Sequence, residues 1–409
     1  MWARGYFCAT GGSVTEETIE RYIECQALSD KEDIFKRSIC KEFESLLMEV
    51  FNLKKEIRLI LLAVLKKRSK LEEEELDTLI KSKQDWGFIA GQLLNHRLSG
   101  YFYEGLNSEQ RYYMLPEFRR TINLLLKGQR KLAIETVNTL QPILNEFDNQ
   151  GIRYAALKGL VFHANIYKIG ERRSNDCDIL VLEEDLEKLD KVLRKFGFIQ
   201  ALGNSNTEAT RKEKIIQRLN YHDLVPYVKE FNLDFLEKLR VDINFHFDSK
   251  DHDITKQIID YGTTIYSNDK YKIKGLKWET HLAHLCVHFH REGSNNIWVD
   301  DKRDVTLYKI VDIINTLRLH SSKEQLYNWL KLMKDFGLEQ QCYFTLYHLM
   351  EFYPNEISED IVDLIRPSEV SFVNEVKINN NIIKTREVSF FDQTFNLVFS
   401  KDFRKQKQD

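Results

Sequence analysis

The stretch that decides the fold reads Leu157-Lys158-Gly159, followed by Arg172-Arg173-Ser174-Asn175-Asp176-Cys177-Asp178-Ile179-Leu180-Val181. The glycine is predicted to lie where a strand turns into a helix, and the apolar run after Asp178 to form a second strand. Two carboxylates one residue apart, Asp176 and Asp178, point to the same side of a strand. Hard divalent cations take several oxygen ligands and often share them with phosphate. The pattern therefore predicts a divalent-cation site beside a phosphate-binding turn.

A third acid, Asp242, lies on a later segment that is predicted to form a strand. Residues 239–247 (LRVDINFHF) alternate apolar and polar side chains, which is typical of a half-buried strand. If this strand pairs beside the earlier one, three carboxylates meet and can hold two metal ions, which clamp the attacking and leaving oxygens of an in-line phosphoryl displacement. The candidate catalytic residues and metal ligands are Asp176, Asp178 and Asp242. The alternative is a turn at a strand start with solvated acids.

The phosphate side of this predicted site combines a glycine turn with basic side chains. A glycine at a helix start lets backbone N–H groups approach a phosphate, and lysine or arginine can neutralise a triphosphate. The candidate ligands are Lys158, Gly159, Arg172 and Arg173. Of the two arginines we expect one to be functional and the other to be solvated or ion-paired. A surface lysine without a role is a close alternative for Lys158.

The composition argues against several classes of protein. The chain has 409 residues, enough for two or three domains. Its 60 Lys and Arg against 63 Asp and Glu leave a net charge of −3, which argues against a dedicated nucleic-acid binder. The 6 cysteines are scattered without a C-x-x-C pair, so neither a zinc ribbon nor a dithiol redox site is expected. Because no signal peptide is recognisable and the longest aliphatic run, 59–65, is too short to span a bilayer, we predict a cytoplasmic protein that does not bind membranes.

The chain is predicted to be an α+β protein, with a small mixed sheet flanked by helical regions on its N-terminal and C-terminal sides. Helical spacing dominates residues 28–150, and short strands and helices follow over 151–275. A helical domain is predicted for 276–365, with helices over 278–290, 300–317, 323–336 and 341–352. The remainder, 366–409, is predicted to hold β-prone pieces at 370–373 and 390–399 and a polar tail.

Residues about 45–320 resemble the bacterial family of uncharacterised nucleotidyltransferases, a branch of the polymerase-β-like nucleotidyltransferase superfamily. The matching features are Asp85-Trp86, His96-Arg97, Gly151-Ile152, Leu157-Lys158-Gly159, Arg172, Asp176-Cys177-Asp178-Ile179-Leu180-Val181, Gly197-Phe198, Val241-Asp242-Ile243, the histidine-rich helix at 281–290 and Asp304-Val305. The resemblance implies that Asp176 and Asp178 are metal ligands, that Asp242 is the third acid and that Gly159 is the glycine of the phosphate turn.

Two positions depart from the pattern of these relatives. Superfamily members often have Gly-Ser at the phosphate turn, where this chain has Gly159-Leu160 preceded by Lys158, so the lysine would substitute as phosphate ligand. The family also tends to have a histidine two residues after the third acid. Here Asn244 occupies that place and His246 follows, which leaves the role of the position open.

The resemblance implies a Mg²⁺-dependent enzyme with a two-metal site. It would transfer a nucleoside monophosphate, AMP by expectation, from an NTP to a hydroxyl or amine and release pyrophosphate. The acceptor stays open between a small molecule, a peptide or protein side chain and an RNA end. One alternative is a catalytically inactive relative that serves as an interaction or antitoxin-like module. Dedicated DNA binding is not expected.

A predicted helix over 278–290 carries His281, His284 and His288 on one face. His284 and His288 have metal-chelating spacing, so a hydrolase built on this helix is a further alternative. A buried helix with hydrogen-bonded imidazoles is favoured, because no glutamate follows the first histidine as H-E-x-x-H requires. A third interpretation follows from the resemblance: the helical domain closes one wall of the site, and His288 or Asp304 handles the acceptor's proton.

Residues 1–27 resemble the C-terminal end of the small single-stranded-DNA Tyr transposases of insertion sequences. Tyr22 matches the position of their nucleophilic tyrosine. The His-hydrophobic-His metal motif of that fold has no counterpart in this chain. We therefore predict a fused remnant or a start codon placed inside an insertion element, and a DNA-acting transposition protein is disfavoured.

Overall fold

The computed structural model describes residues 54–203, 205–300, 303–320, 322–378, 382–386 and 388–396. The chain divides into two compact units, 1–58 and 59–409. The interpretation of residues 1–27, and that of 28–53 as helical, lies outside the described residues. The predicted domain boundaries at 150/151, 275/276 and 365/366 stay predictions.

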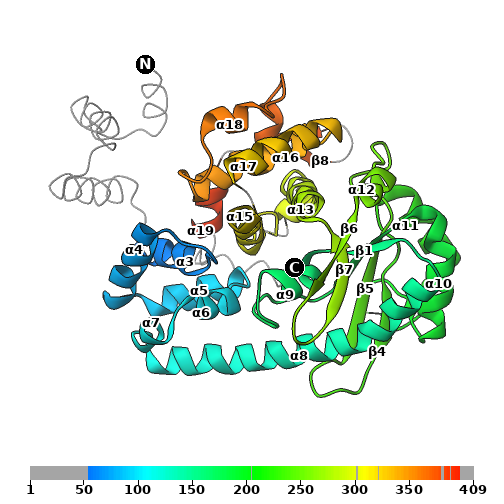
Figure 1. Ribbon diagram of the computed structural model, residues 1–409, viewed down its shortest axis with the longest axis horizontal. Helices are drawn as coiled ribbons and strands as arrows, with labels where there is room; N and C mark the ends of the chain where they lie inside the picture. Colours follow the sequence, from blue (N-terminus) through cyan, green and yellow to red (C-terminus); the bar gives the residue numbers. More distant parts are fainter. Residues whose placement is uncertain are drawn as a thin grey trace. The chain divides into compact units, whose positions relative to one another are not determined.

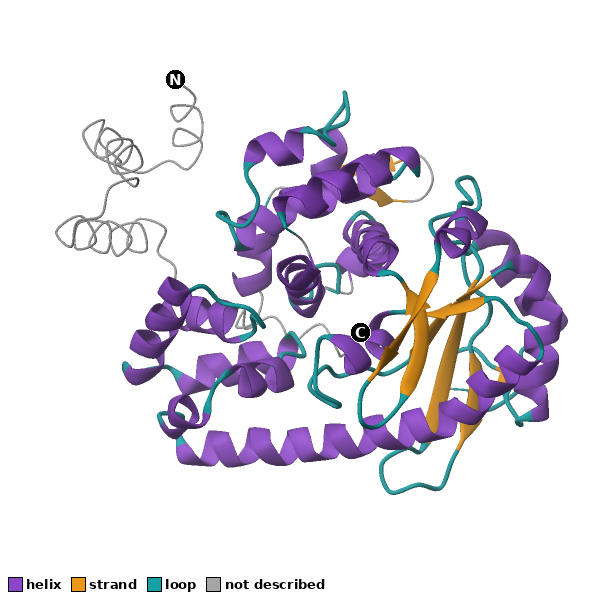
Figure 2. Ribbon diagram, viewed as in Figure 1, coloured by secondary structure: helices purple, strands orange, loops and turns teal. Residues whose placement is uncertain are grey.

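A mixed sheet of seven strands forms the α/β core, in the order β3-β4-β5-β2-β1-β7-β6 (Figure 2). The strands are β1 (Tyr154–Ala156), β2 (Cys177–Val181), β3 (Ile199–Gln200), β4 (Tyr227–Glu230), β5 (Lys238–Asn244), β6 (Thr263–Ser267) and β7 (Lys272–Leu276). β2 pairs with β5 in parallel and with β1 antiparallel. The predicted α+β fold with a small mixed sheet is confirmed.

One face of the central strands is built into a hydrophobic core. Alternate residues of β2 and β5, among them Ile179 and Ile243, belong to a buried cluster that also contains side chains of α8 (Pro116–Asn149) and α10 (Leu186–Lys195). Because side chains alternate across a strand, the intervening residues Asp178 and Asp242 point to the opposite face. The hydrophobic packing on one side thus leaves the acids on the other.

Helices surround this sheet in an arrangement that Figure 1 shows. α8 contacts α6 (Ser99–Gly105) and α10, so it reaches from the N-terminal helices to the sheet (Figure 1). The other helices on the N-terminal side are α3 (Lys55–Ala63), α4 (Lys70–Lys81), α5 (Trp86–Asn95) and α7 (Ser108–Tyr112). Within the core lie α9 (Lys158–Asn165), the 3₁₀ turn Glu183–Asp185, α11 (Arg211–Asn220) and α12 (Thr255–Tyr261).

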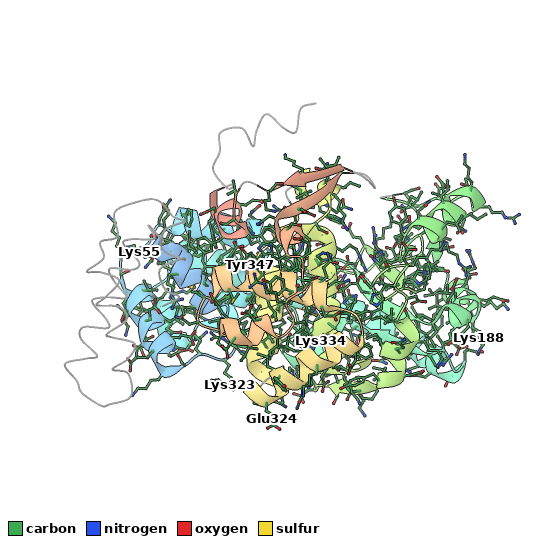
Figure 3. All side chains as sticks on the ribbon, turned by 90° about the horizontal axis from the view of Figure 1, so that it is seen from above. Lys55, Lys188, Lys323, Glu324, Lys334 and Tyr347 are labelled. Carbon is green, nitrogen blue, oxygen red and sulfur yellow. The ribbon has the colours of Figure 1, made fainter. Side chains whose placement is uncertain are left out.

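The C-terminal helices pack around α13 (Trp278–Gly293), which contacts α15 (Tyr308–His320) and α17 (Glu339–Phe352). α16 (Lys323–Asp335) buries Trp329, whose Nε1 donates to the carbonyl of Glu279 at 2.9 Å. Its Lys323, Glu324 and Lys334 are exposed and extend away from the ribbon (Figure 3). α14 (Asn296–Asp300) and α18 (Glu359–Asp363) complete this region. None of the helices in the described ranges is long and apolar enough to cross a membrane.

Three predicted segments differ from the structure. The helix expected over 300–317 starts only at Tyr308, because the buried Asp304 before it accepts hydrogen bonds from Arg386 and Gln393. The β-prone piece 370–373 lies largely in the 3₁₀ turn Ser371–Asn374, and 390–399 begins with α19 (Phe390–Asn396), where Phe390 is buried against His348. The strands of this segment are β8 (Glu375–Ile378) and β9 (Ile382–Thr385).

Candidate active site

The two strands that carry the acids bring Asp178 and Asp242 next to each other. In the parallel ladder of β2 and β5, Asp178 is the direct partner of Asp242. Asp176 precedes β2 by one residue, and its charge interacts with that of Asp178. The structure therefore brings together the three acids that the sequence separates by up to 66 positions.

Each of the two strand acids is paired with a basic side chain. Lys158 Nζ lies 2.8 Å from Asp178 Oδ1, and Arg240 Nε lies 2.8 Å from Asp242 Oδ1. As these side chains stand, no group of three or more His, Cys, Asp or Glu residues in the described part of the chain is placed to hold a metal ion. A metal ion at the acids would have to replace the lysine and arginine charges.

Desolvation and neighbouring negative charge raise the pKa values of two of the three acids, Asp176 and Asp242. Burial and the charge of Asp178 raise the pKa of Asp242 to about 7, although Arg240 acts in the opposite direction. Desolvation and the charge of Asp178 also raise the pKa of Asp176, against the effect of Lys158. A cation that binds between neighbouring carboxylates relieves their repulsion and favours their ionised form. The chemistry of this donor set fits a hard divalent cation such as Mg²⁺.

The predicted phosphate turn lies at the start of α9, directly beside the acids. Gly159 has no room for a side chain, because an added Cβ would lie 2.0 Å from Ser174 Oγ and 3.0 Å from Arg172 Nη1. Lys158 has a φ of 45°, in the left-handed region that side-chain-bearing residues rarely adopt. Its backbone N–H donates to His281 Nε2 at 3.0 Å. A histidine of α13 therefore fixes the turn.

The two adjacent arginines have different surroundings. Arg172 is buried, and its Nε donates to Asp312 Oδ2 at 2.7 Å while Nη1 donates to Ser174 Oγ at 2.8 Å. Its guanidinium also lies over the ring of Tyr308, 5.3 Å from the centroid. Arg173 is exposed and donates to Asn175 Oδ1 at 3.2 Å. Of the two, Arg172 has the fixed geometry that a binding residue needs.

A small pocket, partly open to solvent, lies between the turn and the C-terminal helices. It is lined by Lys158, Arg172, Leu285, His288, Tyr308, Lys309 and Asp312. Three of these side chains are basic, and Lys309 is ion-paired with Glu292. The residues come from α9, the segment before β2, α13 and α15, so the pocket forms only when the sheet and the C-terminal helices pack together.

The histidines of α13 are neutral, because burial lowers their pKa values. The pKa of His281 falls to about 3, and those of His284 and His288 fall well below the usual value. His288 lines the pocket, as one interpretation of the sequence expected. Asp304, the alternative residue of that interpretation, is buried and paired with Arg386 at 2.8 Å.

A model of a family described as uncharacterised nucleotidyltransferase matches residues 82–354, which include the turn, the three acids and α13. The chain belongs to this family. No curated protein matches it significantly. The family match does not reach residues 1–27, whose resemblance to transposases stays a prediction.

In this member of the family, several residues around the candidate site were not predicted from the sequence. Arg240 lies two positions before Asp242, so strand alternation puts both on one face, and this signal was available. Asp312, by contrast, pairs with Arg172 from 140 positions away, and no local pattern links the two. Asp223 also lies near the acids, because its backbone forms an isolated β-bridge with Asn244 of β5. Burial raises the pKa of Asp223.

Proposed function

We propose that this chain is a Mg²⁺-dependent nucleotidyltransferase that moves a nucleoside monophosphate from an NTP to a hydroxyl or amine and releases pyrophosphate. The observation that carries the proposal is the direct pairing of Asp178 with Asp242 on parallel strands, beside a turn that accepts only glycine. The family supports nucleotidyl transfer in general. The metal, the nucleotide and the acceptor are the finer parts of the proposal.

The residues of the chain divide the work by charge. Asp176, Asp178 and Asp242 would hold Mg²⁺, which when bound neutralises charge on the reacting phosphate and positions the attacking oxygen. Lys158, released from Asp178, would turn its ammonium group toward the triphosphate. Arg172 would face the same phosphates from a fixed position, since Asp312 and Ser174 hold its guanidinium. ATP is the expected donor on the resemblance to the family alone.

A transfer assay with a matched pair of variants tests the proposal. Each of the four NTPs, labelled at the α-phosphate, is incubated with the protein, Mg²⁺ and a cell extract, and label transfer and pyrophosphate are measured. Asp178→Asn should lower transfer by roughly 10²–10³-fold or more, because a charge needed in the transition state is lost. Asp190→Asn, which alters an ion pair with Arg194 on α10, is the control. Transfer that survives in a folded Asp178→Asn protein contradicts the mechanism.

One observation favours a second candidate function, a nucleotidyltransferase fold without catalysis that serves as an interaction or antitoxin-like module. Lys158 and Arg240 already neutralise two of the three acids. In such a protein the basic side chains would replace the metal permanently. Calorimetry separates the two functions: the enzyme binds Mg·ATP and loses affinity in Asp178→Asn, whereas the inactive module gives no binding heat in either form.

A further inference from the structure

One side of α13 faces the side of the sheet that carries the acids. His281, His284, His288 and Arg291 follow one another at spacings of three and four residues, so they share this face. At one end His281 accepts from the Lys158 N–H, and at the other Arg291 Nη2 donates to the carbonyls of Phe247 and Asp248, just beyond β5. The face therefore spans from the phosphate turn to the end of the strand that bears Asp242.

Arg291 carries a charge that lacks a matching carboxylate. Within the described ranges no acid lies within ion-pair distance of its guanidinium, and desolvation lowers its pKa. The acids in its surroundings are engaged elsewhere. Asp248 accepts from His252 and Gln341, Glu292 pairs with Lys309, and Asp223 accepts from Gln217. Arg291 therefore makes no direct ion pair within the described ranges, although the charges of Asp248, Asp223 and Glu292 act on it from further away.

Two buried side chains in the same surroundings have polar atoms without partners. His284 is 3% exposed and Asn244 is 6% exposed, yet neither His284 Nδ1 nor Asn244 Nδ2 has a hydrogen-bond partner among the residues described. The ring of His284 lies 5.6 Å from that of Phe247, whose carbonyl Arg291 contacts, and the Arg291 charge acts on His284. Buried polar atoms left unpaired are costly, and a ligand that accepts hydrogen bonds from both side chains would satisfy them.

Asn244 connects this group to the catalytic acids. It lies two residues after Asp242 on β5, on the same face and about 7 Å further along the strand. Its backbone also forms an isolated antiparallel β-bridge with Asp223, and the charge of Asp223 acts on Arg291. An anion held by Arg291 and Asn244 would thus lie near the third acid, at the end of β5.

We propose that Arg291, with His284 and Asn244, binds a phosphate or carboxylate group of the acceptor substrate next to Asp242. This inference rests on the proposed nucleotidyl transfer. It selects acceptors in which the reacting hydroxyl or amine is near an anionic group. Polycationic acceptors are disfavoured, because they would put a positive charge against Arg291.

Calorimetric titration with two simple anions, inorganic phosphate and acetate, tests the site directly. Arg291→Gln should weaken binding of the preferred anion at least tenfold, since a charge-assisted hydrogen-bonded pair is lost. Arg291→Lys, which keeps the charge and one donor to the Phe247 and Asp248 carbonyls, should lose less. Asn244→Leu and His284→Phe remove the other partners without touching Arg291 and should each weaken binding. Arg194→Gln, which removes an exposed arginine on α10, should change nothing.

Lys158→Met distinguishes this anion site from the predicted triphosphate site. Binding that persists in Lys158→Met and falls in Arg291→Gln supports the proposal. Binding that falls in Lys158→Met and is unchanged in a folded Arg291→Gln overturns it, as does the lack of any binding to the wild type at 10 mM anion, roughly the weakest affinity that a functional subsite would need.

The two proposals can fail separately. If phosphate or acetate binds through Arg291 but no NTP gives transfer, the nucleotidyl-transfer proposal fails and the anion site remains. If transfer occurs, Arg291→Gln should raise the KM for the acceptor at least tenfold and leave the affinity for Mg·ATP unchanged. An unchanged acceptor KM overturns the anion site and leaves the transfer reaction intact.

Discussion

Asp242 of the sheet and the histidines of α13 face the same site, and burial shifts their pKa values in opposite directions. Desolvation raises the pKa of Asp242 to about 7 and lowers that of His281 to about 3. Both shifts favour the neutral form of the side chain. The acids, however, can regain their charge when a cation binds, whereas the histidines stay neutral over the physiological range. The sheet therefore carries side chains whose ionisation changes when a cation binds. The facing side of α13 carries neutral histidines and one arginine, Arg291.

This difference predicts two pH dependences of stability that oppose each other below neutral pH. The unfolded chain ionises Asp242 at its ordinary value of 3.8, and the folded chain does so only near 7, so stability falls as the pH rises between these values. For His281 the ordinary value is 6.5 and the folded value about 3, so stability falls as the pH drops below 6.5.

The largest effect is expected for Asp242→Asn. The variant cannot ionise, so relative to the wild type it should gain about 3 kcal/mol of stability between pH 5 and pH 8 without divalent cations. Chemical denaturation at both pH values, with a chelator present, measures this gain. Mg²⁺ at saturating concentration should stabilise the wild type and not the variant. A gain that is equal at the two pH values would show that the acid is not strained by its neighbours.

Gly159→Ala tests the turn where the two regions touch. The added Cβ would overlap Ser174 and crowd Arg172, which we expect to cost about 1–3 kcal/mol of stability and to weaken Mg·ATP binding. Gly128→Ala is the matched control: it lies inside α8, its Cβ would meet only the Phe235 ring at 3.4 Å, and alanine favours a helix by up to about 1 kcal/mol. Ser174→Gly, added to Gly159→Ala, should recover part of the loss. Equal stability of the two alanine variants would contradict the crowded turn.

The smallest effect is expected for His281→Gln. The wild type should lose about 2 kcal/mol through this side chain as the pH falls from 7 to 5, and the variant should be spared that loss. His290→Gln removes another α13 histidine whose pKa burial lowers to about 3. Both variants should show the gain at pH 5 in denaturation curves, but only His281→Gln should alter Mg·ATP affinity, because it changes the acceptor of the Lys158 N–H. The same affinity in both variants would refute the role of His281 in the turn.

The sequence predicts the sheet side of the site better than the helical side. Alternation along residues 239–247 predicts β5 and the face of Asp242, whereas its parallel pairing with β2, which entered the sequence analysis only as a condition, comes from the structure. The partner of Arg172 is not predictable in this way, because Asp312 reaches it through tertiary packing alone. Likewise 390–399 is β-prone locally, yet Phe390 becomes part of a helix since it packs against aromatic rings of α13 and α17. Local β-strand propensity is overridden where contacts with residues distant in the sequence stabilise another conformation.

Hydrogen bonds from residues beyond the family match determine where the chain can be truncated. Arg386 donates to Asp304 and to the carbonyl of Gly293, the last residue of α13, and Lys377 N donates to Ser294 O. These residues come after position 354, where the family match ends. A fragment that ends at position 354 would lack Arg386 and Lys377. Asp304 would then be buried without its arginine partner, and the carbonyls of Gly293 and Ser294 at the end of α13 would lose their donors. Expression of the isolated family region should therefore give a poorly soluble product, and the C-terminal hairpin belongs to any minimal active piece.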